Sequence, residues 1–319
     1  MPPAADRAPV PAVEVPAALA ASHRRYFGAA GDRWVAALPG LAAHWLDRWS
    51  LTPDGPAASG AVALVLPVRR ADGTPAALKV QPVDDETVGE GLALRLWAGR
   101  GAVALLEHDE ASGTMLLERL DAARNLLSEP DDRTATRLIA DLLARFNAVT
   151  APPVLRRLVD VAGATLASVP QALALAADPA ERALLGRVAG LLAELLTEPV
   201  GDRLLHWDLH HSNVLATLDG AGWRAIDPKP LAGDPGFELL PALWNRWDAV
   251  VATGDVPRAV RARFDLMTEV MGLDRGRAAA WTAVRVLQDA CWDLTSGRSV
   301  TISPPHRAVA QAVLERRPG

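Results

Sequence analysis

The stretch HWDLHHSNVL, residues 206–215, places three histidines, an aspartate and an asparagine within ten residues. Histidine and aspartate are the side chains that most often transfer protons or hold metal ions in enzymes. Their density between apolar residues indicates a functional loop. The rest of the chain decides which chemistry that loop performs.

Two common uses of such residues are disfavoured. A zinc site would need a fourth donor beside His206, His210 and His211, and the neighbouring sequence offers no convincing one. A serine nucleophile at Ser212 would need the G-x-S-x-G turn, which is absent. We instead expect His206 to be a buried, hydrogen-bonding histidine that supports the loop. One of His210 and His211 should then face the site.

The whole chain excludes several classes of protein. Its 319 residues suit one large domain or two ordinary ones, and half of them are apolar. The N-terminal sequence MPPAADRAPV lacks a basic start and an apolar centre, and no run of 18 apolar residues follows. We therefore expect a soluble, cytoplasmic protein without a membrane partner. The single cysteine, Cys291, excludes an internal disulfide.

The charge balance points to a small cationic substrate. The net charge of −5 disfavours nucleic acid as a partner, because phosphate backbones bind to basic patches. Of 33 basic residues only Lys79 and Lys229 are lysines. Chance survival is one explanation. The other is that these two positions need a compact ammonium group, which arginine does not replace. The sequence leaves the oligomeric state open.

The apolar spacing changes along the chain. Residues 1–22 are rich in Ala and Pro and are expected to be a poorly ordered lead-in, and residues 22–49 have helical spacing. Strands are expected at 61–68 and 75–82, joined by a turn at 71–73, and at 102–109 and 113–120, with a helix at 84–101 between the pairs.

After residue 120 the pattern is almost wholly helical. Helices are expected at 131–149, 153–169, 178–197, 236–251, 256–272, 275–296 and 305–317. Residues 203–227 instead combine short apolar strands with polar residues, as in a loop-rich site. The fold class is therefore α+β. It has a small antiparallel β-rich lobe at 23–120 and a larger helical lobe at 121–319.

The spacing of Asp208, Asn213 and Asp227, together with a Lys–Glu pair upstream, indicates phosphoryl transfer. Asp208 and Asn213 form H-x-D-x-x-x-x-N with His206, the pattern of a kinase catalytic loop in which the aspartate orients the acceptor hydroxyl and the asparagine binds magnesium. Asp227 follows a short strand and suits a second magnesium ligand. Upstream, Lys79 lies within a strand, eleven residues before Glu90. Such a Lys–Glu pair binds the α- and β-phosphates of ATP.

Four segments carry a resemblance to a known family: PVRRADGTPAALKV, GEGLALRLWAGRGAVALLEHDEASGTMLLERLD, HWDLHHSNVL and AIDPKPLAGDPGFELLPALWNRWD. Over roughly residues 60–250 the chain resembles the aminoglycoside phosphotransferases, in particular the branch of streptomycin 6-kinases and hydroxyurea phosphotransferases. The resemblance implies a two-lobed, protein-kinase-like fold that uses ATP, with GTP as an alternative, and Mg²⁺. The lobe at 23–120 would bind the nucleotide, and the lobe at 121–319 would carry the catalytic loop and the acceptor site. The implied roles are Asp208 as catalytic base or positioner, Asn213 and Asp227 as metal ligands, Lys79 and Glu90 on the triphosphate, Ser59 and Gly60 in the phosphate-covering loop, and Glu118 to Leu120 at the adenine.

Three positions depart from the pattern of that family. Trp207 and Ser212 stand where glycine is usual, so the loop needs a conformation that both side chains tolerate. Glu238 stands where aspartate is common, and we expect it to brace the catalytic loop. Lys229, directly after Asp227 and Pro228, either contacts phosphate or pairs with a nearby carboxylate.

The acceptor site is less sharply defined. Candidate substrate residues are His210, His211, Asn245, Asp248, Asp289 and Asp293. Asp289 and Asp293 lie four residues apart on one helix and would receive a cation, unless Arg285 neutralises the pair internally. Streptomycin, phosphorylated at its 6-hydroxyl, is the leading acceptor, and hydroxyurea is the alternative within the same chemistry. A third interpretation is a catalytically silent kinase-like protein that only binds nucleotide.

Overall fold

The structure is a computed structural model that describes residues 13–315. The described chain forms two compact units. The first comprises residues 13–95 and Val103–Leu120, and the second comprises Leu96–Ala102 and residues 121–315. Of the predicted lead-in, residues 1–12 lie outside the described part of the chain.

The first unit is built on an antiparallel sheet with strand order β1-β3-β4-β6-β5, and β2 also pairs with β3. Gly73, at a φ of 83°, closes the turn between β3 and β4, so the predicted hairpin is confirmed. In the middle strand β4 five successive residues are buried, and Lys79 lies between Val65 and Met115. The bounds are β1 (Thr52–Pro53), β2 (Ala58–Ser59), β3 (Leu64–Arg69), β4 (Pro75–Val80), β5 (Leu105–Asp109) and β6 (Thr114–Glu118).

Two helices accompany this sheet along the chain. α1 (Ala17–Arg48) begins five residues before the predicted start, is interrupted at Gly28, and packs an apolar stripe that includes Leu38 and Leu46 into a core with β3 and β4. α2 (Glu90–Leu96) is shorter than the predicted helix 84–101. Residues 84–89 form turns instead, because the Asp84 carboxylate accepts hydrogen bonds from the backbone N–H groups that follow it.

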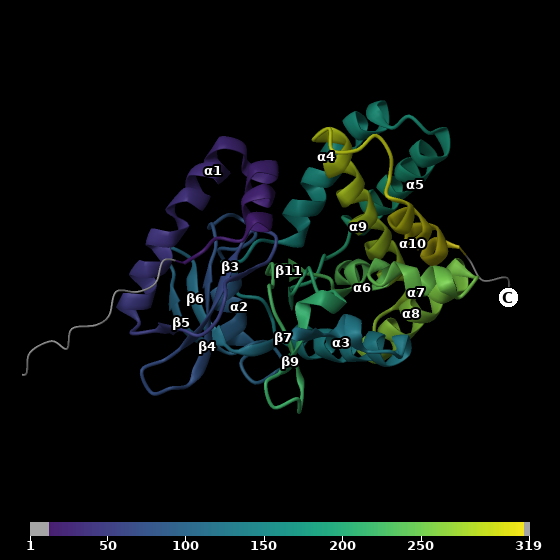
Figure 1. The fold of residues 1–319 in the computed structure, drawn as a ribbon. Helices are drawn as coiled ribbons and strands as arrows, with labels where there is room; N and C mark the ends of the chain where they lie inside the picture. The colour runs from purple at the N-terminus through teal and green to yellow at the C-terminus, as the bar shows by residue number, and fades with distance from the viewer. Residues whose placement is uncertain (1–12, 316–319) are drawn as a thin grey trace, which may run out of the picture. The chain divides into compact units, whose positions relative to one another are not determined.

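The second unit is mainly helical, and α9 is its central element (Figure 1). α9 packs against α4, α5, α10 and the short 3₁₀ helix η3. The predicted helix 236–251 is wrong: it consists of η3 (Pro235–Glu238), α6 (Leu240–Trp244) and α7 (Trp247–Ala252), broken where Arg246 adopts a φ of 56°. The remaining helices are α3 (Asp132–Asn147), α4 (Leu158–Leu175), α5 (Pro179–Leu195), α8 (Val256–Met271), α9 (Arg275–Thr295) and α10 (Pro304–Leu314).

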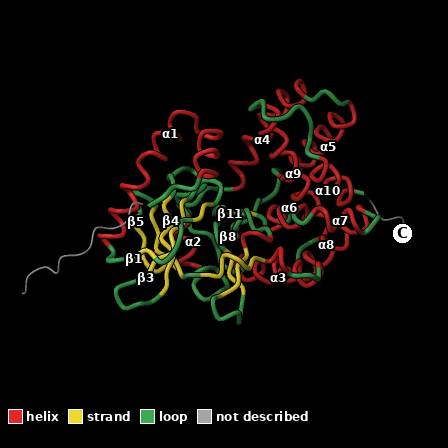
Figure 2. The backbone as a smooth tube through the Cα atoms, viewed as in Figure 1, coloured by secondary structure: helices red, strands yellow, loops and turns green. Residues whose placement is uncertain are grey.

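Short strands in the second unit hold the polar segments of the sequence in place (Figure 2). β10, β9 and β7 form one small sheet, and β11 pairs with β8. Residues 206–213 connect β8 to β9, and residues 226–230 connect β10 to β11. β7 was not predicted, because its sequence is only partly apolar. The bounds are β7 (Leu120–Asn125), β8 (Arg203–Leu205), β9 (Val214–Thr217), β10 (Trp223–Ala225) and β11 (Leu231–Gly233).

One helix, α4, is long and apolar enough to cross a membrane by length and composition among the residues that the structure describes. Core helices of soluble proteins meet the same test. α4 contains Pro170 and packs against α5, α9 and β11.

Candidate active site

The segment between β8 and β9 folds back on itself and brings Asp208 and Asn213 together. The backbone N–H of Asn213 donates to the His210 carbonyl at 2.9 Å, within the short 3₁₀ helix region η2 (His211–Asn213). The side-chain Nδ2 of Asn213 donates to the Asp208 carbonyl at 3.0 Å. Because this bond occupies the nitrogen end of the amide, the Oδ1 end is directed away from the Asp208 backbone.

The segment that carries Asp227 is fixed to the same loop on both sides. The Ile226 N–H donates to the Asn213 carbonyl at 2.9 Å, and the Lys229 N–H donates to the His206 carbonyl at 3.0 Å. Between these bonds Asp227 adopts a φ of 57°, in the left-handed region. Strained backbone of this kind concentrates at functional sites, where the surrounding contacts enforce it. The segments bearing Asp208, Asn213 and Asp227 therefore form one constellation.

Trp207 occupies the left-handed conformation that its place in the loop demands. Its φ is 65°, which costs a non-glycine residue about 1–2 kcal/mol. The indole is buried, and the guanidinium groups of Arg156 and Arg285 each lie 5.1 Å from the ring centroid. These cation–π contacts offset part of the strain. Ser212 is not among the residues with positive φ, so its site does not require glycine.

Glu238 braces the loop through hydrogen bonds to its backbone, as predicted. Its Oε2 accepts hydrogen bonds from the backbone N–H groups of His206 and Trp207, and its Oε1 accepts one from Asn147 Nδ2 at 2.6 Å. The carboxyl group is fully buried, and burial raises its pKa to about 7 despite these donors. By accepting these bonds, the carboxylate holds the two residues before Asp208 in place.

In the first unit, Lys79 and Glu90 form a buried ion pair. Lys79 Nζ lies 2.7 Å from Glu90 Oε1, and Gln81 Nε2 donates to Glu90 Oε2 at 2.6 Å. All three side chains are at most 4% exposed. Sequence analysis missed Gln81. The signal was its position two residues after Lys79, which places both side chains on the same side of the extended chain where β4 ends.

Comparisons with known proteins agree with this geometry. The family described as aminoglycoside/hydroxyurea antibiotic resistance kinase matches residues 48–297. The chain belongs to this family. It is 56% identical to the streptomycin 6-kinase of Streptomyces glaucescens over 94% of its own length and 97% of the relative's. It is 54% identical to the hydroxyurea phosphotransferase of Kitasatospora aureofaciens over 95% and 87% of the two chains. The predicted family and small-molecule kinase activity are confirmed.

A solved structure shares the fold of this kinase. A thermostable mutant of aminoglycoside phosphotransferase APH(4)-Ia, in a ternary complex with AMP-PNP and hygromycin B, aligns with a TM-score of 0.58 at 14% identity. The alignment covers 86% of this chain and 97% of the other. The predicted α+β, protein-kinase-like fold is thereby confirmed.

The three histidines of the kinase loop have different environments. His206 is buried, its Nε2 lies 3.1 Å from the Ile226 carbonyl, and its ring stacks near Trp97 and Phe146. Burial lowers the pKa of His206 to about 3, so the ring is neutral. The prediction of a buried, hydrogen-bonding His206 is confirmed. His210 lies within the electrostatic reach of Asp208 and Asp227.

The position of His211 does not fit its predicted role as an acceptor-binding residue. It has no exposed surface, so direct contact with an acceptor does not fit its position. The charges of Arg263, Arg246 and Asp132 influence its ring, and burial lowers its pKa to about 3. Of the two histidines proposed to face the site, the structure therefore favours His210.

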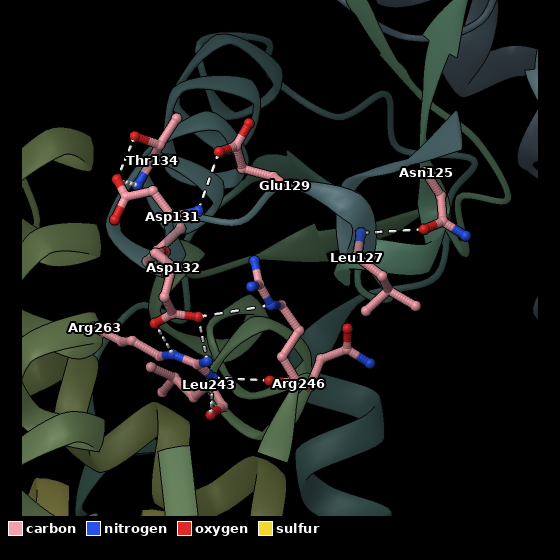
Figure 3. Close-up of polar contacts among 11 residues, drawn as sticks. Asn125, Leu127, Glu129, Asp131, Asp132, Thr134, Leu243, Arg246 and Arg263 are labelled. Carbon is pink, nitrogen blue, oxygen red and sulfur yellow. Dashed lines mark hydrogen bonds and ion pairs between the residues drawn. The ribbon is translucent and has the colours of Figure 1, made fainter. Parts of the chain in front are cut away.

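The other candidate acceptor residues are dispersed over α6 to α9. Arg263 bonds to Asp132 through two nitrogens and donates to the carbonyls of Leu243 and Asn245, which fixes the start of the α6–α7 connection (Figure 3). Asp248 is exposed in the first turn of α7, and Asp293 is half-buried.

Asp289 is already paired within the protein. Its carboxylate accepts from Arg285 Nε at 3.1 Å and lies 3.9 Å from His306 Nδ1. Internal neutralisation by Arg285, the alternative left open by the sequence, is what the structure shows. A substrate cation at Asp289 would have to compete with this pair.

The remaining nucleotide candidates lie in the first unit. Ser59 pairs with Leu64, and the Gly60 N–H donates to the Ala63 carbonyl at 3.1 Å, so both belong to the tight turn between β2 and β3. Glu118 ends β6, and Leu120 begins β7 and is buried. Their roles in nucleotide binding remain predictions.

The donor set of the second unit fits magnesium. Asn213 and Asp227 offer an amide and a carboxylate oxygen, which are hard donors of the kind that Mg²⁺ takes. Within residues 13–315 no group of three or more His, Cys, Asp or Glu side chains could hold a metal alone. Magnesium suits such an incomplete set, because it typically takes one or two carboxylates and completes its shell with phosphate and water.

Proposed function

We propose that this kinase transfers the γ-phosphoryl group of ATP to the 6-hydroxyl of streptomycin, and that it acts in the cytoplasm. The observation that carries the proposal is the fixed Asp208–Asn213–Asp227 constellation. The 56% and 52% identity to two streptomycin 6-kinases, each over 94% of this chain, supports the choice of acceptor. Streptomycin is a polycation, which the acidic balance of the chain favours.

Asp208 is proposed to accept the proton of the acceptor hydroxyl as the oxygen attacks the γ-phosphorus. The O–P bond forms, the bond to the β-phosphate bridging oxygen breaks, and ADP leaves with that electron pair. Phosphoryl transfer depends mainly on positioning and charge neutralisation, so the rigidity of the loop is its main contribution. The Glu238 hydrogen bonds to His206 and Trp207 supply that rigidity.

Phosphate binding is assigned to Lys79, with Glu90 and Gln81 holding its ammonium group in place. Asn213 and Asp227 would hold magnesium, which when bound supplies positive charge to the phosphate oxygens. Ser59 and Gly60 are proposed to cover the phosphates, and the backbone at Glu118 to Leu120 to bind adenine. ATP is preferred over GTP in this proposal.

Hydroxyurea is the second candidate acceptor. The 54% identity to a hydroxyurea phosphotransferase lies between the 56% and 52% identities to the two streptomycin kinases. Trp207, whose indole fills buried space beside the catalytic aspartate, would suit a small acceptor. The chemistry is unchanged, since hydroxyurea also presents a hydroxyl group.

The test is an assay of purified protein with Mg²⁺ and ATP against streptomycin, other aminoglycosides and hydroxyurea, with ADP release and product mass as readouts. Transfer to streptomycin is expected, with a position on the product that fragmentation assigns. Asp208→Ala should lower kcat by roughly 10³-fold or more. Retention of over a tenth of the wild-type rate would contradict the assignment. Nucleotide binding without transfer to any acceptor would favour the silent kinase-like alternative.

A further inference from the structure

Lys229 lies against the catalytic aspartate. Its Nζ is 3.5 Å from Asp208 Oδ2, and its backbone N–H donates to the His206 carbonyl at 3.0 Å. Pro228 and Pro230 flank it, which restricts the backbone at and around this residue. The backbone of Lys229 is thus fixed relative to the catalytic loop.

Stability does not explain this ion pair. The side chains of Lys229 and Asp208 are 40% and 28% exposed, and pairs this exposed contribute about 0–1 kcal/mol. A structural pair would also tolerate arginine, which is the basic residue at all but two of the 33 basic positions in the chain. The other lysine, Lys79, is in the buried pair with Glu90. A compact ammonium at residue 229 therefore points to a functional contact.

The charges around Lys229 show what such a contact would do. Asp208 and Asp227 both act electrostatically on His210, as does Lys229, so two carboxylates and one ammonium share this part of the loop. Carboxylates repel a phosphoryl group that carries negative charge. A cation at the point of attack offsets that repulsion and stabilises the charge that spreads over the phosphoryl oxygens in the transition state.

We propose that Lys229 is a catalytic residue whose ammonium group contacts the γ-phosphoryl oxygens during transfer. This rests on the proposed kinase function. Without nucleotide the ammonium is paired with the Asp208 carboxylate, and with ATP bound it is shared between that carboxylate and the γ-phosphoryl oxygens. When the acceptor proton passes to Asp208, that carboxylate loses its charge, and the ammonium interacts more strongly with the phosphoryl oxygens while the acceptor O–P bond forms and ADP leaves. Lys229 itself keeps all its protons.

The contact can be tested by comparing AMP-PNP, which carries a γ-phosphoryl group, with ADP, which does not. Lys229→Met removes the charge at nearly constant volume. It should raise the Kd of AMP-PNP about tenfold, the effect of losing one charge-assisted hydrogen bond, and leave the Kd of ADP within about twofold. Lys79→Met should weaken the binding of both nucleotides, because its contacts are assigned to the α- and β-phosphates. Calorimetry with Mg²⁺ present measures all four constants.

The kinetic effect should fall on turnover. Lys229→Met should lower kcat about 10²-fold with KM for the acceptor changed less than about threefold, and Lys229→Arg should restore part of the loss through its charge. Arg261→Met is the matched control, since Arg261 forms a partly exposed pair with Glu315 in the same unit. The control should leave kcat unchanged. Lys229→Met and Arg261→Met should both keep the thermal midpoint of the wild type within about 2 °C.

Three results would overturn the proposal. One is a kcat for Lys229→Met within threefold of the wild type. Another is a fall in kcat with no selective loss of AMP-PNP binding, which would make Lys229 only a positioning residue for Asp208. The third is equal weakening of ADP and AMP-PNP. If the wild-type protein phosphorylates no acceptor, the proposed function fails, and the comparison of AMP-PNP with ADP still decides the role of Lys229.

Discussion

The Oε2 atom of Glu238 lies 3.0 Å from the backbone nitrogen of Trp207, the residue directly before Asp208. The same oxygen accepts from the His206 N–H. Thirty-one residues separate Glu238 from Trp207, so the conformation of the loop depends on η3, on which Glu238 lies. This coupling makes both residues sensitive probes of the site.

Glu238 should give the protein an unusual pH dependence. Its pKa in the folded state is raised to about 7, mainly by burial, from 4.5. As the pH falls from 7.5 to 5.5 the folded state gains a proton that the unfolded state does not bind, so this group contributes stability that is lost as pH rises through 7. His206 and His211 act in the opposite direction, because burial lowers their pKa from 6.5 to about 3 and only the unfolded state binds their protons over that range.

Glu238→Gln isolates the glutamate contribution. Gln keeps the shape and an accepting oxygen, and the Asn147 amide can turn to match the new nitrogen. We expect the urea-determined free energy of unfolding of the variant to fall more steeply than that of the wild type between pH 7.5 and pH 5.5, because only the histidine contribution remains. Parallel pH profiles for the two proteins would show that Glu238 does not titrate in this range.

Replacement of Trp207 by glycine and by alanine should give an unusual order of stability. Both substitutions remove a buried indole, which typically costs 3–5 kcal/mol. At a φ of 65°, however, only glycine escapes the left-handed penalty, so Trp207→Gly should be about 1 kcal/mol more stable than Trp207→Ala.

The control for this order is Ser212, which does not have positive φ. There Ser212→Ala should be more stable than Ser212→Gly, because alanine restricts the unfolded chain more. Thermal unfolding of the four variants tests both orders. The same order at both sites would mean that Trp207 does not adopt the left-handed conformation in solution.

Gly91 leaves no room for a side chain beside Glu90. A β-carbon at Gly91 would overlap the ring of His108, on the neighbouring strand β5. Gly91→Ala should therefore cost about 1–3 kcal/mol and weaken ADP binding several-fold by displacing Glu90 from Lys79. Adding His108→Ala should recover most of both losses.

A control for this effect is available in α4. No atom lies within 4 Å of a β-carbon built on Gly163, so Gly163→Ala should be neutral or stabilising by up to about 1 kcal/mol. ADP titrations and thermal unfolding of these variants are the measurements. Additive effects of Gly91→Ala and His108→Ala would rule out the predicted overlap.

The Arg263–Asp132 pair should stabilise the connection between α6 and α7. Arg263 is 4% exposed, bonds to Asp132 through two nitrogens and holds the carbonyls of Leu243 and Asn245. Arg263→Met removes the donor from both carbonyls and leaves Asp132 with Arg246 at 3.8 Å, so it should lower the free energy of unfolding by about 2–4 kcal/mol. It should also raise KM for the acceptor, if Asn245 and Asp248 bind it.

The comparison for Arg263 is an exposed pair. Arg137 and Asp141 lie 3.9 Å apart on the surface of α3, and Arg137→Ala should cost less than about 0.5 kcal/mol with KM unchanged. Urea unfolding measures both variants. An Arg263→Met variant as stable as Arg137→Ala would contradict the anchoring role.

The sequence alone predicted the family and the strands of the first two hairpins, which are confirmed, and it supplied the residues of the kinase pattern, whose roles remain predictions. These features are local: H-x-D-x-x-x-x-N, the turn at Gly73 and helical apolar periods each extend over a few residues, so the chain displays them directly. Prediction from local sequence patterns was wrong at two places. The break at Arg246 and the strand β7 depend on neighbours distant in sequence, and the periodicity of 236–251 and 120–125 carries no sign of them.

Only the tertiary structure decided how the site is supported. The hydrogen bonds of Glu238 to His206 and Trp207, the arginines beside the Trp207 ring, and the approach of Lys229 to Asp208 join residues between about twenty and eighty positions apart. Such contacts arise when helices and strands pack, and a single sequence contains no repeating pattern that encodes them. The residues proposed to react are therefore found in short motifs, whereas their orientation and charge environment follow from packing.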